Sequence, residues 1–312
     1  MVRIGVDVGG TGIQMGVVND AGKIISRDGI PTRIDLPIEE QISQIASCII
    51  RTAAAAGYQP QDIDSVGFGI PGIANRTGTI IKCINMNWHY IPFAELFKKH
   101  LSCPIFIDND ANVAALAESV AGVSRGTSSS VFLTLGTGIG SGIILNGRIW
   151  SGAHGIGGEF GHTIFSLDGN LCTCGNHGCL ERYCSANALI RMAREAVPTH
   201  PDSLILSSAN GDPDKITART VIDAAREQDP LAVELFDRYT SYLAQAIANV
   251  VNFLDPEIIA LGGGVSKAGS FLLDPIRAKY KDHVLFRDQP MAPIELAVLG
   301  ADAGIIGAAM LS

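Results

Sequence analysis

The sequence predicts an α/β protein made of two related lobes, and three observations lead to this fold class. The chain has 312 residues, which is enough for two domains. Apolar strand patterns alternate with helical patterns along it. A unit of strand, glycine turn and strand occurs twice, because residues 10–16 read GTGIQMG and residues 136–142 read GTGIGSG. The repeat indicates two lobes that face each other, with a ligand in the cleft between them.

The first lobe is expected to begin with a β-hairpin. Residues 4–8 and 13–18 have the pattern of short apolar strands, and the glycine-rich residues 9–12 form the tip. Residues 36–57 are predicted to be helical, because isoleucines recur on one face. Further elements of this part of the chain are predicted as strands at 65–70 and 105–107 and as a helix at 111–121.

The second half continues the same alternation. A long helix is predicted after Asp229-Pro230, where Asp can cap the helix and Pro suits its first position. A strand at 258–261 leads into a glycine run, and residues 300–310 are predicted as a helix packed closely through its glycines. Residues 199–214 are expected to be a mobile surface loop. The predicted lobes are residues 1–120 plus 297–312, and residues 121–296.

Composition limits the function classes. Hydrophobic residues make up 47% and charged residues 17%, as in globular proteins, and the net charge is −8. The acidic balance argues against a nucleic-acid partner. No apolar run reaches the length of a membrane span, and no secretory signal is visible. We therefore expect a cytoplasmic protein, in which clustered cysteines indicate a metal site rather than disulfides.

A cysteine-rich window at 159–184 predicts a zinc site. Cys172, Cys174 and Cys179 lie among glycines, and three thiolates with one imidazole can close a tetrahedral shell around Zn²⁺. His162, His177 and Cys184 are the candidates for the fourth ligand. Four protein ligands leave no open position, so the metal is expected to be structural. Two further carboxylates flank the window, Glu159 and Glu181, and such a shell does not need them.

The glycine turns are candidate phosphate sites. Their backbone N–H groups lack a neighbouring Cβ, and a threonine hydroxyl lies among them. The alternative is a plain β-hairpin, but two copies and a third glycine run favour phosphate. Asp7 just before the first turn is placed to hold Mg²⁺, or else caps local backbone N–H groups. The candidate phosphate-binding residues are Gly9, Gly10, Thr11, Gly12, Gly136, Thr137, Gly138, Gly263 and Gly264.

Asp108-Asn109-Asp110 follows a predicted strand and opens a predicted helix. One of the two acids is expected to cap that helix, because acids are favoured there. A carboxylate at a strand end beside a cleft is also where a general base would lie. Both interpretations stay open on position alone.

Together these motifs resemble the ROK family, which contains bacterial sugar kinases and sugar-responsive repressors. The resemblance covers nearly the whole chain in the family's order. The residues that carry it are Asp7-Val8-Gly9-Gly10-Thr11, Pro71-Gly72, Asn109-Asp110-Ala111-Asn112, Leu135-Gly136-Thr137-Gly138-Ile139-Gly140, Glu159-Phe160-Gly161-His162, Cys172-x-Cys174-Gly175-x-x-Gly178-Cys179-x-Glu181 and Gly262-Gly263-Gly264-Val265.

The resemblance implies an actin-like ATPase (ribonuclease H-like) fold, with ATP and a sugar in the cleft between the lobes. It makes Asp110 the general base that accepts the proton of the attacking sugar hydroxyl. It assigns the glycine turns to ATP, and it chooses His162 as the zinc ligand beside Cys172, Cys174 and Cys179. The implied cofactors are ATP, Mg²⁺ on Asp7 and structural Zn²⁺. The implied sugar-binding residues are Gly72, Asn85, Asn109, Asp110, Glu159, His162 and Glu181.

Within the family, the segment Asn85-Met86-Asn87-Trp88 favours glucose as the substrate, phosphorylated at its 6-hydroxyl. N-acetylmannosamine is the alternative, and fructose, allose and N-acetylglucosamine are others. A repressor is disfavoured because its DNA-binding domain would precede Asp7, although a sugar-sensing regulator without that domain stays open. An actin-like filament protein is disfavoured by the carboxylates and the zinc window. A homodimer or homotetramer is expected.

Overall fold

The computed structural model describes residues 1–312, and its contacts divide the chain into two compact units. Unit 1 comprises Met1–Phe132, Gly142–Gly158 and Ala297–Ser312, and unit 2 comprises Leu133–Ser141 and Glu159–Leu296. The predicted lobe boundaries stay a prediction. No helix of the structure has both the length and the apolar character that crossing a membrane requires.

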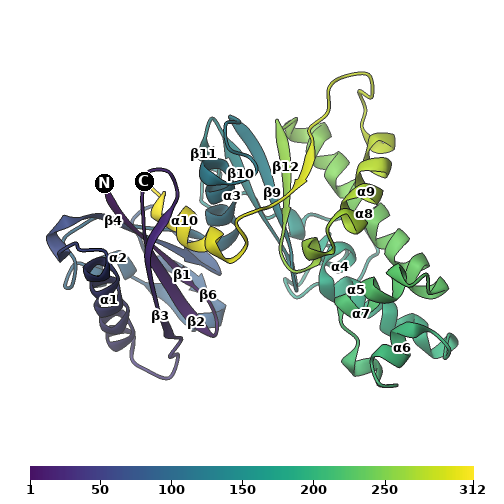
Figure 1. The fold of residues 1–312 in the computed structure, drawn as a ribbon, viewed down its shortest axis with the longest axis horizontal. Coiled ribbons are helices and arrows are strands. Elements are labelled where there is room, and N and C mark those ends of the chain that lie inside the picture. Colours follow the sequence, from purple (N-terminus) through teal and green to yellow (C-terminus); the bar gives the residue numbers. More distant parts are fainter. The chain divides into compact units, whose positions relative to one another are not determined.

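Unit 1 is built on a five-stranded sheet of order β3-β2-β1-β4-β8 (Figure 1). β1 pairs antiparallel with β2 and parallel with β4, and β4 pairs parallel with β8. The predicted hairpin with a glycine tip is therefore confirmed. Unit 1 also contains a three-stranded sheet of order β5-β6-β7. The strands are β1 Val2–Val8, β2 Gly12–Val18, β3 Ile24–Pro31, β4 Ile63–Ile70, β5 Gly72–Ala74, β6 Ile80–Cys83, β7 Trp88–Ile91 and β8 Ile105–Asn109.

The helices of unit 1 follow the apolar patterns. In α1 the predicted face is confirmed, since Ile42, Ile45 and Ile49 are buried in the same core as the strands. Phe93 and Phe97 of α2 pack on Phe68 of β4, with ring centroids 5.0 Å apart in each pair. The helices are α1 Ile38–Ala55, α2 Phe93–Phe97, α3 Asp110–Ala121 and α10 Ala303–Ala309.

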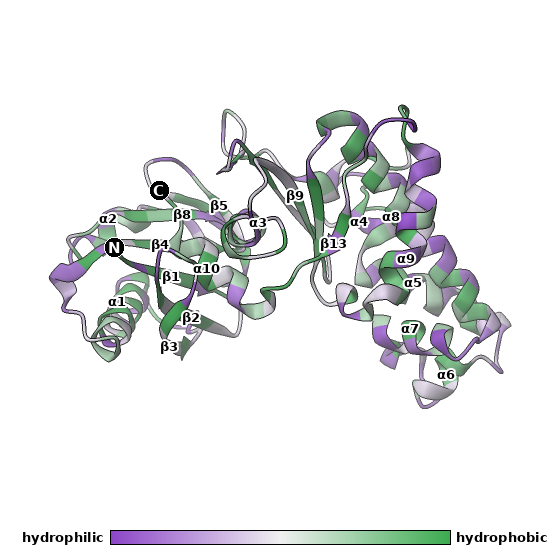
Figure 2. Ribbon diagram, turned by 45° about the horizontal axis from the view of Figure 1, so that its top comes forward, coloured by the Kyte–Doolittle hydropathy of each residue, from purple (hydrophilic) through white to green (hydrophobic).

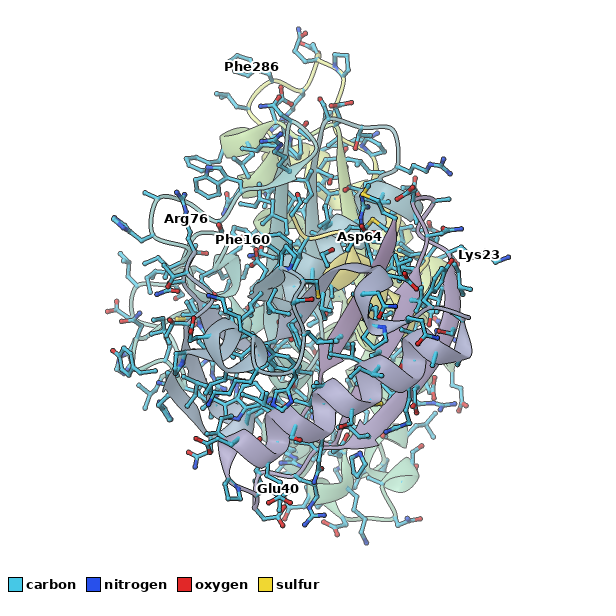
Figure 3. All side chains as sticks on the ribbon, turned by 90° about the vertical axis from the view of Figure 1, so that its left-hand side faces the viewer. Lys23, Glu40, Asp64, Arg76, Phe160 and Phe286 are labelled. Atoms are coloured by element: carbon cyan, nitrogen blue, oxygen red, sulfur yellow. The ribbon has the colours of Figure 1, made fainter.

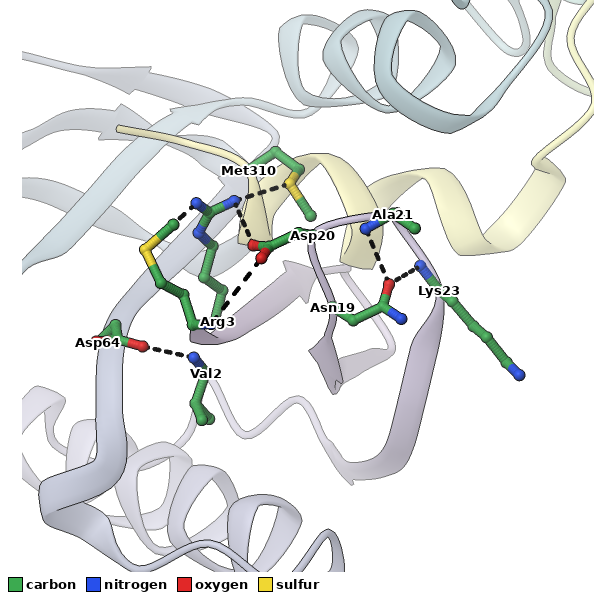
Figure 4. A network of polar contacts seen from close by, with 9 residues as sticks. Val2, Arg3, Asn19, Asp20, Ala21, Lys23, Asp64 and Met310 are labelled. Atoms are coloured by element: carbon green, nitrogen blue, oxygen red, sulfur yellow. Dashed lines mark hydrogen bonds and ion pairs between the residues drawn. The ribbon is translucent and has the colours of Figure 1, made fainter.

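Glycines let α10 lie directly on the main sheet of unit 1. A Cβ on Gly5 would clash with the backbone oxygen of Ile305, and one on Gly67 would clash with that of Ala308. Gly307 of α10 meets the Val113 carbonyl of α3 in the same way. At the end of α10, Met310 contacts the guanidinium of Arg3 on β1, with Sδ 3.3 Å from Nη1 (Figure 4). The predicted close packing of the C-terminal helix is thus confirmed.

A second five-stranded sheet has the order β11-β10-β9-β12-β13, and the strands β9 and β10 each contribute residues to both units. β9 is coloured mainly as hydrophobic in Figure 2, and Val131, Leu133 and Leu135 are buried. β9 and β10 are neighbours that flank the second glycine turn, as β1 and β2 flank the first. The strands are β9 Ser129–Leu135, β10 Ile139–Leu145, β11 Arg148–Ile149, β12 Ile258–Gly262 and β13 Ile294–Leu296.

The helices of unit 2 centre on α8, whose predicted cap is confirmed. The Asp229 carboxylate accepts a bond of 2.8 Å from the Ala232 N–H, Pro230 is the first helical residue, and the helix ends at Leu254. In the loop between α9 and β13, Phe286 is 69% exposed (Figure 3). The helices are α4 Glu181–Cys184, α5 Ala186–Ala196, α6 Leu204–Ser208, α7 Ala218–Arg226, α8 Pro230–Leu254 and α9 Ser270–Lys279.

One prediction about unit 2 is wrong in part. Residues 199–214 were expected to be loop throughout, but they contain α6. The Asp229 carboxylate accepts hydrogen bonds from the Leu204 N–H and the Ser203 hydroxyl, at 2.9 and 3.0 Å. Both donors lie at the start of α6. A partner that is 25 residues away along the chain therefore stabilises a segment whose local composition favours a loop.

We predict that Gly67→Ala lowers the free energy of unfolding by about 1–3 kcal/mol, because the new methyl group would overlap the Ala308 carbonyl of α10. Denaturant unfolding measures the change. Gly12→Ala is the matched control, since a Cβ there would lie 3.6 Å from its nearest neighbours, an ordinary contact. Equal stability of the two variants would contradict the close packing of α10.

Candidate functional site

Two half-buried acids lie at the same level of the main sheet in unit 1. Asp7 on β1 pairs with Gly69 on β4, and Gly69 pairs with Asp108 on β8. Burial raises the pKa of Asp7 and of Asp108 above the usual aspartate value. Perturbed acids at the carboxyl ends of parallel strands are typical of functional sites in α/β proteins.

Asp7 lies against the first turn of α10. A Cβ on Gly304 would come within 2.6 Å of its carboxylate oxygen, so only glycine leaves room for this acid. Mg²⁺ in phosphate-binding sites is commonly held by one or two carboxylates together with water and phosphate oxygens. A single carboxylate that ends a strand just before a glycine turn fits that ligand set.

The first glycine turn is closed by its own backbone. The Gly9 N–H donates to the Gly12 carbonyl over 3.0 Å, and the Gly9 carbonyl accepts from the Thr32 hydroxyl over 2.7 Å. Gly10 and Thr11 at the tip are exposed. Asn85 lies beside this tip, because a Cβ on Gly10 would be 3.9 Å from its amide nitrogen. Sequence reasoning missed Thr32, which follows β3 and carries no motif of its own.

The turn from β8 into α3 holds the predicted base. The helix cap is Asn109, whose side-chain oxygen accepts from the Ala111 N–H over 2.9 Å, so the expectation that one of the acids caps the helix is wrong. Asp110 is the first residue of α3, and its carboxylate also accepts from that N–H at 2.9 Å. The Asn109 amide donates to the Gly72 carbonyl over 3.3 Å. Three of the predicted sugar-binding residues are therefore neighbours in unit 1.

Asp108 is already engaged in shaping this turn. Its Oδ1 accepts from the Asn109 N–H over 2.7 Å and from the Asn112 side chain over 2.8 Å. These two bonds, rather than a capping bond to α3, engage its Oδ1. The cap then goes to the next polar side chain along the chain, Asn109.

The second glycine turn lies in unit 2 and meets the third glycine run. The Gly136 N–H donates to the Gly138 carbonyl over 3.0 Å, and the Ala186 N–H donates to the Gly136 carbonyl over 2.8 Å. Gly263 has a φ of +86°, and a Cβ there would come within 2.6 Å of the Leu135 carbonyl. The structure therefore brings together two of the predicted phosphate-binding segments.

A pocket of about 580 Å³ opens beside these two glycine segments, a size typical of small-ligand sites. Gly136 and Thr137 line one side, and Gly264 lines another. Sequence reasoning missed the rest of the lining, because no local pattern marks it and only the fold gathers it from α5, α7 and the segment after β12. The polar members among these residues are Asn187, Thr217, Arg219, Asp223, Arg226 and Lys267.

The predicted metal ligands form a compact cluster in unit 2. The ligand atoms of His162, Cys172, Cys174 and Cys179 all lie within 4.8 Å of one another. His162 Nδ1 is 3.7 Å from Cys172 Sγ, and Cys174 Sγ is 3.5 Å from Cys179 Sγ. His177 and Cys184 are not members, so the geometry favours His162 among the three candidates. Three thiols and an imidazole at these separations fit a tetrahedral zinc site.

The thiols of the cluster differ in acidity. Burial, followed by the neighbouring thiols, raises the pKa of Cys179 to about 12. A backbone hydrogen bond from Asn176 contributes most to the lowered pKa of exposed Cys174. A buried thiol with so high a pKa becomes a thiolate readily only beside a cation. The donor set therefore suits a metal ion better than three isolated thiolates.

The two flanking carboxylates have different surroundings. Glu159 is exposed and precedes the short 3₁₀ helix Phe160–His162. Glu181, at the start of α4, is half-buried and accepts a hydrogen bond of 3.0 Å from the Ile139 N–H at the end of the second glycine turn. The 3₁₀ helix itself is tied to β10, since the Phe160 N–H donates to the Ser141 hydroxyl over 3.1 Å.

The ROK family profile matches residues 3–312 of this chain. A glucokinase of Halalkalibacterium halodurans is 39% identical over 99% of the chain and 94% of its own length. The crystal structure of a ROK family glucokinase from Streptomyces griseus, in complex with glucose and AMPPNP, has a TM-score of 0.80 at 33% identity and covers 99% of this chain and 98% of its own. A ROK hexokinase structure from Thermus thermophilus has a TM-score of 0.86 at 32% identity, with 99% and 97% covered.

This chain belongs to the ROK family.

Membership in the ROK family confirms the fold class predicted from the sequence, the actin-like ATPase fold. The roles of the individual site residues stay predictions.

We predict that Cys174→Ser lowers the metal content of the purified protein from about one zinc per chain to a small fraction of that, because three ligands hold Zn²⁺ far less tightly than four. Elemental analysis measures it. Cys103→Ser is the matched control, since Cys103 is a half-buried thiol outside the cluster. Full zinc content in Cys174→Ser, or none in the wild type, would contradict the assignment.

Proposed function

We propose that this protein is an ATP-dependent hexose kinase that phosphorylates glucose at its 6-hydroxyl. The observation that carries the proposal is the similarity to glucokinases along the whole chain, at up to 39% identity. Three features of the chain support it as well. They are the glycine turns suited to phosphate, a carboxylate at a strand end, and a loop that carries the candidate metal ligands between two acids.

In this proposal Asp110 is the general base. Phosphoryl transfer passes through a loose transition state, so catalysis depends on aligning the acceptor hydroxyl and on neutralising charge. A carboxylate at the start of α3 can accept the hydroxyl proton as the bond to phosphorus forms. Its bond to the Ala111 N–H and the neighbouring Asn109–Gly72 contact fix its direction. Asn109 and Asn85 then supply amide groups for sugar hydroxyls.

The nucleotide is assigned to the glycine turns and the pocket beside Gly136. Backbone N–H groups of both turns and of Gly263-Gly264 would bind phosphate oxygens. The pocket of about 580 Å³ in unit 2 would take the nucleoside. Asp7 would hold Mg²⁺, which neutralises phosphate charge when it is bound. The pocket supports ATP as donor because it adjoins two of the three glycine segments.

Glu159, His162 and Glu181 are proposed to bind the sugar. Carboxylates accept paired hydrogen bonds from neighbouring hydroxyls, which a hexose ring presents. His162 would bind Zn²⁺ through Nδ1, the atom that faces Cys172, and its other nitrogen is left for the sugar. The zinc is structural in this proposal, since all four ligands come from the protein. A homodimeric or homotetrameric state and a cytoplasmic location stay predictions.

We predict that Asp110→Asn lowers kcat by about 10²–10⁴-fold, because an amide cannot accept the hydroxyl proton. Glucose binding should change little, since Asn keeps the shape of the side chain and an oxygen for the Ala111 N–H. A coupled assay of ADP release and calorimetry with glucose measure the two effects. Near-normal turnover in the variant would rule out Asp110 as the base.

Substrate choice is tested by ADP release with glucose, mannose, fructose, allose, N-acetylmannosamine and N-acetylglucosamine. We expect the highest kcat/KM with glucose, and a product that carries phosphate on the 6-oxygen by NMR. A preference for an N-acetylated sugar would replace glucose and leave the kinase assignment in place. If ADP were released at the same rate with each of these sugars and in the absence of any sugar, the protein would not be a hexose kinase.

A further inference from the structure

One carboxylate in unit 2 contacts both the metal cluster and the second glycine turn. Glu181 Oε2 accepts from the Ile139 N–H over 3.0 Å, and Glu181 Oε1 lies 3.8 Å from the sulfur of Cys172. The carboxylate also packs on Gly138, where a Cβ would clash with Oε2. Glu181 therefore spans the distance between a candidate metal ligand and a candidate phosphate-binding residue.

Other contacts join the same two parts of the chain. The Phe160 N–H donates to the Ser141 hydroxyl, and a Cβ on Gly161 would clash with the Ile139 carbonyl, so the turn that carries His162 lies against β10. Beyond Glu181, the start of α5 bonds to the glycine turn through the Ala186 N–H. The cluster and the glycine turn are thus neighbours with several direct contacts.

The segment that carries the cysteines has little regular structure of its own. Between His162 and Glu181 the chain forms two isolated β-bridges, Ile164 with Cys179 and Leu171 with His177. Such a loop depends on cross-links for its order, and a metal held by four side chains supplies them. Cys172 lies inside this loop, and Glu181 follows directly after it as the first residue of α4.

We propose that Glu181 couples the metal-binding loop to the glycine turn 136–138, so that metal occupancy sets the affinity of the nucleotide site. The inference rests on the proposed function, since it takes this turn as a binder of nucleotide phosphate. With the loop ordered, Glu181 holds the Ile139 N–H and keeps Gly138 in the conformation that presents its backbone. Without that order the turn loses this contact, and the phosphates meet a less organised site.

Coupling of this kind is reciprocal. If the metal tightens nucleotide binding by some factor, the nucleotide must tighten metal binding by the same factor. Glu181 is a positioning residue for the nucleotide in this scheme, in addition to its proposed contact with the sugar. The two roles separate in experiments without sugar.

The test measures ADP binding by calorimetry without sugar, in metal-loaded protein and in protein stripped of zinc, desalted and returned to Mg²⁺. In the wild type we expect stripping to weaken ADP binding about tenfold, within the usual range of coupling between sites. In Glu181→Ala, metal-loaded protein should already bind ADP about tenfold more weakly, and stripping should change this less than twofold. Glu181→Gln, which keeps an oxygen for the Ile139 N–H, should restore most of the affinity.

Asp168→Asn is the matched control, because Asp168 is an exposed acid of the same loop and should behave as the wild type. A second readout is the transfer of zinc to a chromogenic chelator, which ADP should slow in the wild type and not in Glu181→Ala. If circular dichroism shows that zinc removal unfolds the protein, the comparison is made between the metal-loaded proteins. Unchanged ADP affinity in metal-loaded Glu181→Ala overturns the coupling, and weakened affinity supports it.

The outcomes also separate this inference from the proposed function. A glucose kinase whose ADP affinity is the same with and without zinc overturns the coupling alone. A protein that shows the coupling in ADP binding and phosphorylates no sugar supports the coupling and contradicts the proposed function. Equal weakening on stripping in the wild type and in Glu181→Ala shows that Glu181 is not the connection, and it overturns the inference.

Discussion

The close backbone contact between α10 and the main sheet is the constraint on which unit 1 depends. A side chain in place of Gly5 or Gly67 on the strands would clash with the backbone of α10. A side chain in place of Gly307 on the helix would clash with the backbone of α3. The same approach brings Gly304 against the Asp7 carboxylate. Burial raises the pKa of Asp7, and this burial comes from the packing of α10 on the sheet. A candidate Mg²⁺ ligand, Asp7, is thus packed directly against a helix of unit 1.

Much of the fold could be predicted from the sequence because its signals are local. The apolar face of α1, the Asp229–Pro230 start of α8 and the glycine hairpins each depend on residues within a few positions of one another. The cysteine cluster was predictable for the same reason, since its three cysteines lie within eight residues of one another in the sequence. Assigning roles to the site residues needed the family resemblance, because spacing alone left Asp108, Asp110 and the fourth zinc ligand undecided.

What the sequence could not predict depends on contacts between distant segments. The pocket beside Gly136 takes Arg219 and Asp223 from α7 and Lys267 from the segment after β12, none of which belongs to a motif. The helix α6 forms in a stretch of loop-like composition, where Asp229 accepts a hydrogen bond from the N–H of its first residue, Leu204. The contact of Glu181 with the Ile139 N–H joins residues 42 positions apart. Such pairings become visible only when the chain is folded.

The position of α10 in the chain has a consequence for synthesis. The helix belongs to unit 1, yet the ribosome adds its residues only after those of unit 2. The strands β1 and β4 are made early and must wait, with glycine-lined surfaces uncovered, while all of unit 2 is translated. Unit 2 can therefore acquire its structure first on the ribosome, and unit 1 becomes complete only once α10 has been made. Protease digestion of stalled nascent chains ending before residue 297 would show whether unit 1 is still open.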